Sequence, residues 1–201
     1  VLALSEQTKQ LVSGLEEDVT VYQIVENDGD EDEYITELLR RYSDLSRKFH
    51  YESINVVLYP NFVSQYTQET LYKNSLVVVS GKRSTVIDYF DIYQYSFEDG
   101  STSDNVQVQD IQFYGEEKLT TAVDYVTTDV LPVVYTLTGH GEGDYTDLLK
   151  ELIDGDNIEL RSLSLVQQGG VPEDCSALVI NAPSLDLSEE ERDWILSYLE
   201  Q

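Results

Sequence analysis

The stretch from Leu131 to Ile153 changes its hydrophobic period part-way along, and this change constrains the fold more than any other feature. Its first part, residues 133–137, is a short apolar run typical of a buried strand. Its second part repeats apolar residues every three or four positions from Tyr145 onward, as one face of a helix does. The stretch therefore predicts a strand followed by a helix, as in a parallel α/β sheet.

The loop between the two parts carries the candidate site. In a parallel α/β sheet such a loop lies at the carboxyl edge of the strands, where ligands usually bind. For the loop itself we favour a structural role over ligand capture: the glycines allow a tight turn and the polar side chains bond backbone amides at the start of the helix. The candidate ligand- or partner-binding residues are Thr138, Gly139, His140, Gly141 and Glu142 of this loop, with Asn181 at the end of a later predicted strand.

The charge of the chain excludes several classes of partner. Its 201 residues include 39 acidic and 12 basic ones, for a net charge of −27. Such a chain repels the phosphates of nucleic acids and the headgroups of anionic lipids, so we expect neither DNA nor RNA as a partner. Since no apolar run reaches the roughly 18 residues of a membrane helix, we expect this stretch of chain to be soluble.

Cysteine and histidine are too scarce for the common metal centres. The one cysteine, Cys175, rules out an internal disulfide and a cysteine-based zinc cluster, and we expect it to be a structural thiol. There are two histidines, so a histidine-rich site is excluded, although His140, Glu142 and Asp144 could form a weak one. We predict neither a metal nor a cofactor.

Residues 1–114 are predicted to form a thioredoxin-like α/β module, because helices and strands follow in the order of that fold. The loop after its first strand is the acidic run 26–33, where thioredoxins carry a Cys-x-x-Cys pair, so thiol redox chemistry is excluded. This run also lacks the glycine and the last glutamate of a calcium loop, which favours a solvated loop. The predicted elements are a helix 7–15 capped by Ser5, strands 19–25 and 54–59, helices 34–49 and 63–71, and a hairpin of strands 75–79 and 84–88.

Aromatic residues are concentrated after this hairpin. Tyr89, Phe90, Tyr93, Tyr95 and Phe97 lie within nine residues, and we favour core or cross-strand packing over a sugar-stacking platform. A linking helix over residues 115–129 then leads to the second domain.

Residues 130–201 are predicted to form a partial flavodoxin-like, amidotransferase-like α/β domain. Strands at 133–137, 158–165 and 177–181 alternate with helices, which implies right-handed crossovers and a mostly parallel sheet. The last helix begins at Ser188, where Ser188 and Glu191 match the capping-box pattern. We expect such a sheet to be incomplete at Gln201.

Six short motifs in order give the chain a resemblance to a known family. They are residues 4–9 (LSEQTK), 19–22 (VTVY), 115–122 (GEEKLTTA), 138–142 (TGHGE), 171–174 (VPED) and 187–191 (LSEEE). The chain resembles the extracytoplasmic auxiliary component of ABC-type transport systems, which includes gliding-motility-associated proteins. The resemblance implies a soluble region outside the cytoplasmic membrane, anchored by helices before and after it, with the permease and ATPase subunits as partners. Because the sequence starts at Val1 and contains no methionine, we also expect it to be part of a longer protein.

Three functional hypotheses stay open. The first is a non-catalytic accessory domain that binds the permease or presents cargo to it. The second is a small-molecule or carbohydrate binding domain with its site at the Gly139 loop, for which a deep pocket is expected rather than a shallow surface with exposed aromatics. The third is a hydrolase on a flavodoxin-like sheet, with Thr136 or Thr138 as nucleophile near His140. Because the chain has no Gly-x-Ser-x-Gly elbow, we predict that it is not an enzyme.

Overall fold

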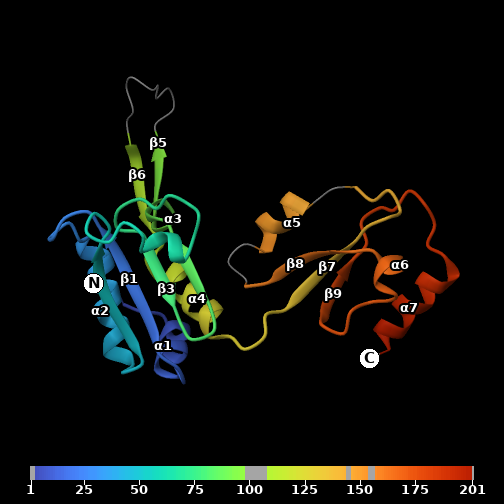
Figure 1. Cartoon of the computed structure of the whole chain (residues 1–201), viewed down its shortest axis with the longest axis horizontal. Coiled ribbons are helices and arrows are strands. Elements are labelled where there is room, and N and C mark those ends of the chain that lie inside the picture. Colours follow the sequence, from blue (N-terminus) through green and yellow to red (C-terminus); the bar gives the residue numbers. More distant parts are fainter. Residues whose placement is uncertain (1–2, 98–107, 144–145, 154–156, 201) are drawn as a thin grey trace. The chain divides into compact units, whose positions relative to one another are not determined.

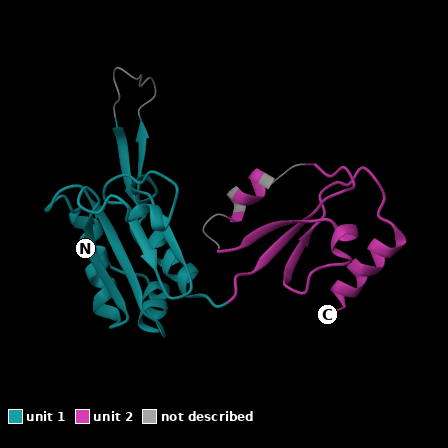
Figure 2. Cartoon of the chain, in the orientation of Figure 1, with its two compact units in different colours: residues 1–129 teal, residues 130–201 magenta. Residues whose placement is uncertain are grey.

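The computed structural model describes residues 3–97, 108–143, 146–153 and 157–200. The chain divides into two compact units, unit 1 from residue 1 to 129 and unit 2 from residue 130 to 201 (Figures 1 and 2). Each unit has its own sheet and its own apolar core, so both are mixed α/β structures.

A four-stranded sheet in the order β2-β1-β3-β4 is the centre of unit 1. β1 (Val19–Val25) pairs in parallel with β2 (Phe49–Asn55). On its other side β1 pairs antiparallel with β3 (Leu76–Val79), which forms the predicted hairpin with β4 (Ser84–Ile87). The apolar runs of β1 and β3 fit this central position, since strands covered on both faces need apolar residues throughout.

Three helices share one core with the sheet: α1 (Glu6–Ser13), α2 (Glu33–Leu45) and α4 (Gly115–Thr127). Polar contacts also join them. The Thr8 hydroxyl donates to Glu116 Oε1 at 2.8 Å, and the buried Tyr42 hydroxyl lies 2.6 Å from Thr120 Oγ1. Phe62, in the irregular segment that follows β2, packs edge-on to Tyr22 of β1 with ring centroids 4.8 Å apart.

The predicted linking helix is an integral part of unit 1. α4 contacts β3 and β4, and buries Leu119, Ala122 and Val123 in the core of this unit. Its last carbonyl groups have no partners within the helix, and two basic side chains of the β3–β4 turn bind them. Arg83 donates to the carbonyl groups of Tyr125 and Thr128, and Lys82 donates to that of Thr127 at 3.0 Å.

A second, two-stranded sheet extends from unit 1 as a hairpin of β5 (Tyr93–Phe97) and β6 (Val108–Phe113) (Figure 1). It follows the short helix α3 (Tyr89–Ile92), which Asp88 caps. Tyr93, Tyr95 and Phe97 of the aromatic cluster pair across this hairpin, which is the cross-strand packing that the sequence favours, whereas Tyr89 and Phe90 belong to α3.

Asn74 fixes the acidic loop after β1. It lies just before β3 with φ of 66° and is almost fully buried. Its side chain accepts from the Asp32 backbone N–H and from Gln23 Nε2, and donates to the Asp30 carbonyl, all at 3.0 Å. Asp32 in turn caps α2 through the N–H groups of Tyr34 and Ile35. The second half of the acidic run is therefore fixed rather than simply solvated.

Three parallel strands in the order β8-β7-β9 form the sheet of unit 2. They are β7 (Val133–Leu137), β8 (Glu159–Leu163) and β9 (Cys175–Val179), with helix α5 (Thr146–Ile153) between β7 and β8. The short α6 (Leu165–Gln168) and α7 (Glu189–Leu199) complete the unit. Alternate residues of β7 enter a core to which Trp194 and Ile195 of α7 contribute.

Several predicted boundaries were wrong. α2 ends at Leu45, and β2 runs from Phe49 to Asn55 instead of 54–59, because β2 pairs with β1 along its whole length. The predicted helix 63–71 is a single turn, Val63–Gln65. The predicted strand 158–165 ends at Leu163, and the chain turns at once into α6, which Gly169 ends in the left-handed conformation. None of the described helices combines the length and the apolar character needed to cross a bilayer.

Candidate functional site

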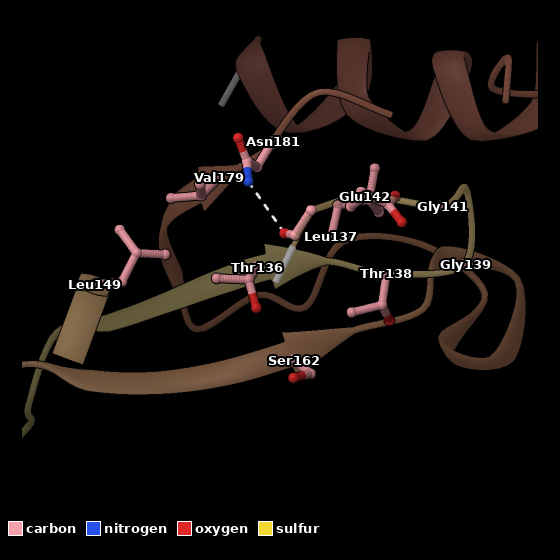
Figure 3. A pocket seen from close by; sticks show the side chains of 11 residues that line it. Thr136, Leu137, Thr138, Gly139, Gly141, Glu142, Leu149, Ser162, Val179 and Asn181 are labelled. Carbon is pink, nitrogen blue, oxygen red and sulfur yellow. Dashed lines mark hydrogen bonds between the residues drawn. The ribbon is translucent and has the colours of Figure 1, made fainter. Parts of the chain in front are cut away.

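A partly open pocket of about 410 Å³ lies at the carboxyl ends of the unit 2 strands (Figure 3). Residues from the end of β7 and its following loop form most of it, and β8, β9 and α5 supply the rest. Hydroxyl, amide and glycine backbone groups share its lining with the aliphatic side chains of Leu137, Leu149 and Val179, and its one charged residue is Glu142. The lining residues are Thr136, Leu137, Thr138, Gly139, Gly141, Glu142, Gly143, Leu149, Ser162, Val179 and Asn181.

The loop after β7 needs its glycines for two different reasons. Gly139 has φ of 113° in open space, and Gly141 has φ of 70°. At Gly141 a Cβ atom would in addition overlap with the Ser184 hydroxyl. The two loops that follow β7 and β9 come together here, because the His140 carbonyl accepts from the N–H groups of Ser184 at 2.9 Å and Leu185 at 3.0 Å.

His140 lies between two carboxylates and is 8% exposed. Its Nδ1 is 3.1 Å from Glu142 Oε1, and its Nε2 is 3.0 Å from Glu191 Oε1. Glu142 also accepts from the His140 backbone N–H through Oε2 at 2.8 Å. Side-chain exposures of 7% for Glu142 and 4% for Glu191 show that both carboxylates are buried with the ring.

Glu191 connects this cluster to the last helix. Ser188 and Glu191 form the predicted capping box of α7: the Ser188 hydroxyl accepts from the Glu191 N–H, and Glu191 accepts from the Ser188 N–H at 2.9 Å. Within the part of the chain that the structure describes, Glu191 Oε1 has no hydrogen bond of good geometry, so its charge is compensated by the ion pair with His140. The Glu191 side chain thus takes part in capping α7 and also pairs with the loop after β7.

The charges of the cluster stabilise one another. Burial alone would lower the pKa of His140, but the bonds and charges of Glu191 and Glu142 outweigh it and raise this pKa above its ordinary value. Burial opposes ionisation of Glu142 as well, yet backbone N–H groups and His140 lower its pKa. The Ser188 N–H, more than any other group, lowers the pKa of Glu191. The cluster is therefore an imidazolium between two carboxylates at mildly acidic pH.

The candidate residues fall into two groups. Thr138, Gly139, Gly141, Glu142 and Asn181 all line the pocket, and Asn181 donates to the Gly143 carbonyl at 3.1 Å (Figure 3). The Thr138 hydroxyl donates to the Leu163 carbonyl at 3.2 Å, which ties it to β8. His140 does not line the pocket. Its side chain instead connects the loop after β7 to Glu191 of α7.

Sequence reasoning missed two polar residues of this site: Ser162, which lines the pocket from β8, and Glu191, which pairs with His140. Thr136 lines the pocket from β7, although the sequence suggested it only as a possible nucleophile. The capping-box pattern singled out Glu191, but only for its role at the helix start. We expected the polar side chains of the Gly139 loop to bond the start of the next helix; those of His140 and Glu142 instead pair with each other, and His140 also pairs with Glu191 of α7.

Among the described residues, no group of three or more His, Cys, Asp or Glu side chains is arranged to hold a metal ion. Asp144, which the weak metal site would have needed, lies outside the described residues. Cys175 is a free, half-buried thiol that begins β9 and packs against the unit 2 core.

The comparison with protein families matches the first part of the chain. Residues 2–95 are similar to a family described as a domain of unknown function (DUF7088). This match covers most of unit 1 and none of the pocket in unit 2.

Comparison with curated proteins gives no match. Among solved structures, the chain is similar to the NTD_N/C domain of the alkylhydroperoxide reductase AhpF from Enterococcus faecalis (V583). The TM-score is 0.37 at 13% identity, with 83% of each chain covered.

Proposed function

We propose that this chain is a non-catalytic binding module, the extracytoplasmic region of a membrane-anchored accessory subunit of an ABC-type transport system. Its work would be to bind the permease partner or to present cargo to it. The proposal that the module is non-catalytic rests on His140. Both of its ring nitrogens pair with buried carboxylates, those of Glu142 and Glu191. A general base needs a free nitrogen within reach of its substrate. The six motifs shared with the auxiliary family support the transport context.

The strand orders support a finer description of the two units. In unit 1, the order β2-β1-β3-β4 with one parallel and two antiparallel pairs agrees with a thioredoxin-like module. In unit 2, the order β8-β7-β9 corresponds to the first three strands of the flavodoxin-like order 2-1-3-4-5. This is an analogy of folds, and folds alone do not decide function.

The pocket favours a second candidate function, the binding of a small neutral ligand such as a carbohydrate. It lies where the loops after β7 and β9 meet, and in sheets of the 2-1-3 type ligands bind at this switch point. Its volume of about 410 Å³ falls within the range of small-molecule sites. Hydroxyl and amide groups of Thr136, Ser162 and Asn181 suit the hydroxyl groups of a sugar, and the acidic surroundings disfavour an anion.

Co-purification tests the first proposal. The full-length protein is solubilised from membranes in mild detergent, and the eluate is examined for permease and ATPase subunits. We expect both subunits to elute with it in constant ratio. Recovery of the full-length protein in the cytosolic fraction without transporter subunits would refute the assignment.

Thermal-shift titration of the 201-residue chain tests the second. Neutral mono- and disaccharides serve as probes, and a stabilising sugar should lose its effect in a Thr136→Val, Asn181→Ala variant. Ser197→Ala, an exposed change on α7, is the matched control. A sugar that stabilises all three proteins equally does not bind in this pocket.

A further inference from the structure

The β5–β6 hairpin has one apolar face and one polar face. Cross-strand pairing places Tyr93 opposite Phe113, Tyr95 opposite Ile111 and Phe97 opposite Val108. The intervening pairs, Gln94 with Gln112 and Ser96 with Asp110, point to the other face, and a register shift between Ser96 and Phe97 then skips Gln109 of β6. A two-stranded hairpin is marginally stable in water unless its apolar face packs on something. Toward the far end of the hairpin that face is open, with exposures of 53% for Phe97, 53% for Ile111 and 47% for Val108.

Aromatic rings continue this face onto the body of unit 1. The ring centroid of Phe90 lies 6.3 Å from the ring centroid of Tyr95 and 5.0 Å from the ring centroid of Tyr72. At the base of the hairpin, the ring of Phe113 packs against that of Tyr34 of α2, with ring centroids 6.3 Å apart. Half or more of the surface of Phe90, Tyr72 and Tyr34 is exposed. We call the exposed members the aromatic strip: Tyr34, Tyr72, Phe90, Phe97, Val108 and Ile111.

Carboxylates border the aromatic strip. Tyr93 pairs with Phe113 at the base of the hairpin, and its hydroxyl donates to Asp32 Oδ1 at 2.9 Å, which connects the hairpin to the acidic loop. Glu33 and Asp91 are exposed, and each is adjacent in sequence to a member of the strip, Tyr34 and Phe90. Lys73, next to Tyr72, is the basic residue nearest in sequence to the strip.

We propose that the aromatic strip and its carboxylates form a docking surface for a basic segment of a partner protein, one that alternates arginine or lysine with apolar residues. Aromatic faces attract cations, arginine above all, and neighbouring carboxylates strengthen this attraction. The apolar residues of the partner would cover the exposed rings. Beside the strip the carboxylates of Glu33 and Asp91 outnumber the one neighbouring cation, Lys73, so the local charge favours a basic partner.

Charge complementarity decides against the other occupants. A second copy of this chain would bring another net charge of −27 against the same carboxylates. Unit 2 is also acidic, with Lys150, Arg161 and Arg192 as its basic residues, and the last two pair with acidic neighbours. Anionic lipid is repelled in the same way. The surface is distinct from the pocket of unit 2, so the inference stands apart from the transport assignment.

Fluorescence anisotropy with the 201-residue chain tests the proposal. The probe is a short fluorescein-labelled peptide of alternating arginine and leucine, compared with a glutamate–leucine peptide of equal length. We expect the basic peptide alone to bind, and to bind less tightly as salt rises. Phe90→Ala with Ile111→Ala should weaken binding by about tenfold or more, because exposed aromatic anchors carry much of the energy of such interfaces.

Two matched controls separate the strip from general effects. Val57→Ala with Leu58→Ala removes apolar side chains that lie outside the strip and are even more exposed than Phe90 and Ile111, and it should leave binding unchanged. Glu33→Lys with Asp91→Lys should weaken binding, whereas Glu16→Lys with Glu52→Lys, which changes the net charge equally away from the strip, should have a much smaller effect. All these positions are exposed, and unchanged melting temperatures confirm folding.

Four results would overturn the proposal. The first is equal binding of the two peptides, or binding of neither. The second is equal loss of affinity in the control and strip variants. The third is a dimer, seen by light scattering, that the Phe90→Ala, Ile111→Ala variant abolishes, which would assign the strip to a second copy. The fourth is strip-dependent binding to phosphatidylcholine vesicles, which would assign it to a membrane.

Discussion

Replacing His140 by alanine should destabilise unit 2 strongly, because it leaves two buried carboxylates without their counter-charge. The side chains of Glu142 and Glu191 are 7% and 4% exposed, and each lies about 3 Å from a ring nitrogen of His140. Removing one partner of a buried ion pair costs about 3–5 kcal/mol. A domain the size of unit 2 has a total stability of only about 4–11 kcal/mol. We therefore expect His140→Ala to unfold unit 2 at markedly lower urea concentration.

Trp194 makes this loss measurable in one unit of the chain. It is the single tryptophan of the protein and packs against the unit 2 core, so its fluorescence reports the unfolding of unit 2. Asn181→Ala is the matched control, since it removes one hydrogen bond at the same pocket and should cost about 1 kcal/mol. A loss below about 1 kcal/mol in His140→Ala, together with weaker complex formation, would show that His140 serves binding instead.

The same cluster predicts a pH optimum for unit 2. The pKa of His140 is raised in the folded state, so its contribution is complete below the ordinary value of 6.5 and is lost as pH rises through the raised pKa. The pKa values of Glu142 and Glu191 are lowered, so their contribution is complete above 4.5 and is lost as pH falls through the lowered values. Stability monitored by Trp194 should be greatest between these limits, and the alkaline loss should be absent in His140→Ala.

Three further predictions concern single residues. Asn74→Ala should destabilise unit 1 in urea, monitored by circular dichroism, by about 2–4 kcal/mol, because it leaves buried Gln23 Nε2 without its partner and places alanine at φ of 66°; Asn74→Gly, which lacks the backbone strain, should lose less. Gly141→Ala should lower the unit 2 midpoint more than Gly139→Ala, since only at Gly141 does a Cβ meet the Ser184 hydroxyl, and equal losses would contradict this. Cys175→Ser should cost less than about 1 kcal/mol by the same measurement and leave partner binding intact, because the thiol is half-buried at the edge of the core.

Local pattern predicted the elements whose patterns are strong. The β-branched runs of β1 and β3, the apolar face of α4 and the capping box of α7 are all present as expected. β2 was misplaced because its sequence, FHYESIN, alternates weakly, and parallel pairing with β1 rather than its own pattern sets its limits. The helix predicted over 63–71 is a single turn, Val63–Gln65, and it directly follows Phe62, whose ring packs on Tyr22 of the sheet.

The sequence indicated where the candidate site lies but not how its side chains pair. A glycine-bracketed loop after a strand indicates the carboxyl edge of a sheet, and the pocket lies there. The pairing of His140 with Glu191 joins residues far apart in sequence, and no local pattern contains it. As a result, two residues that looked exposed and available from the sequence, His140 and Glu142, have buried side chains in an ion-paired cluster.

The acidic run shows why composition understates what a loop can do. By composition, the carboxylates of this run serve solubility. Mobile charged side chains contribute little binding free energy, because they lose conformational entropy when a partner orders them. In the structure Asn74 fixes the backbone at Asp30 and Asp32, and Asp32 caps α2 while accepting from the Tyr93 hydroxyl. Charges fixed beside exposed rings lose less entropy when a cationic partner arrives. The loop is therefore better suited to selecting a basic segment than its sequence alone indicates.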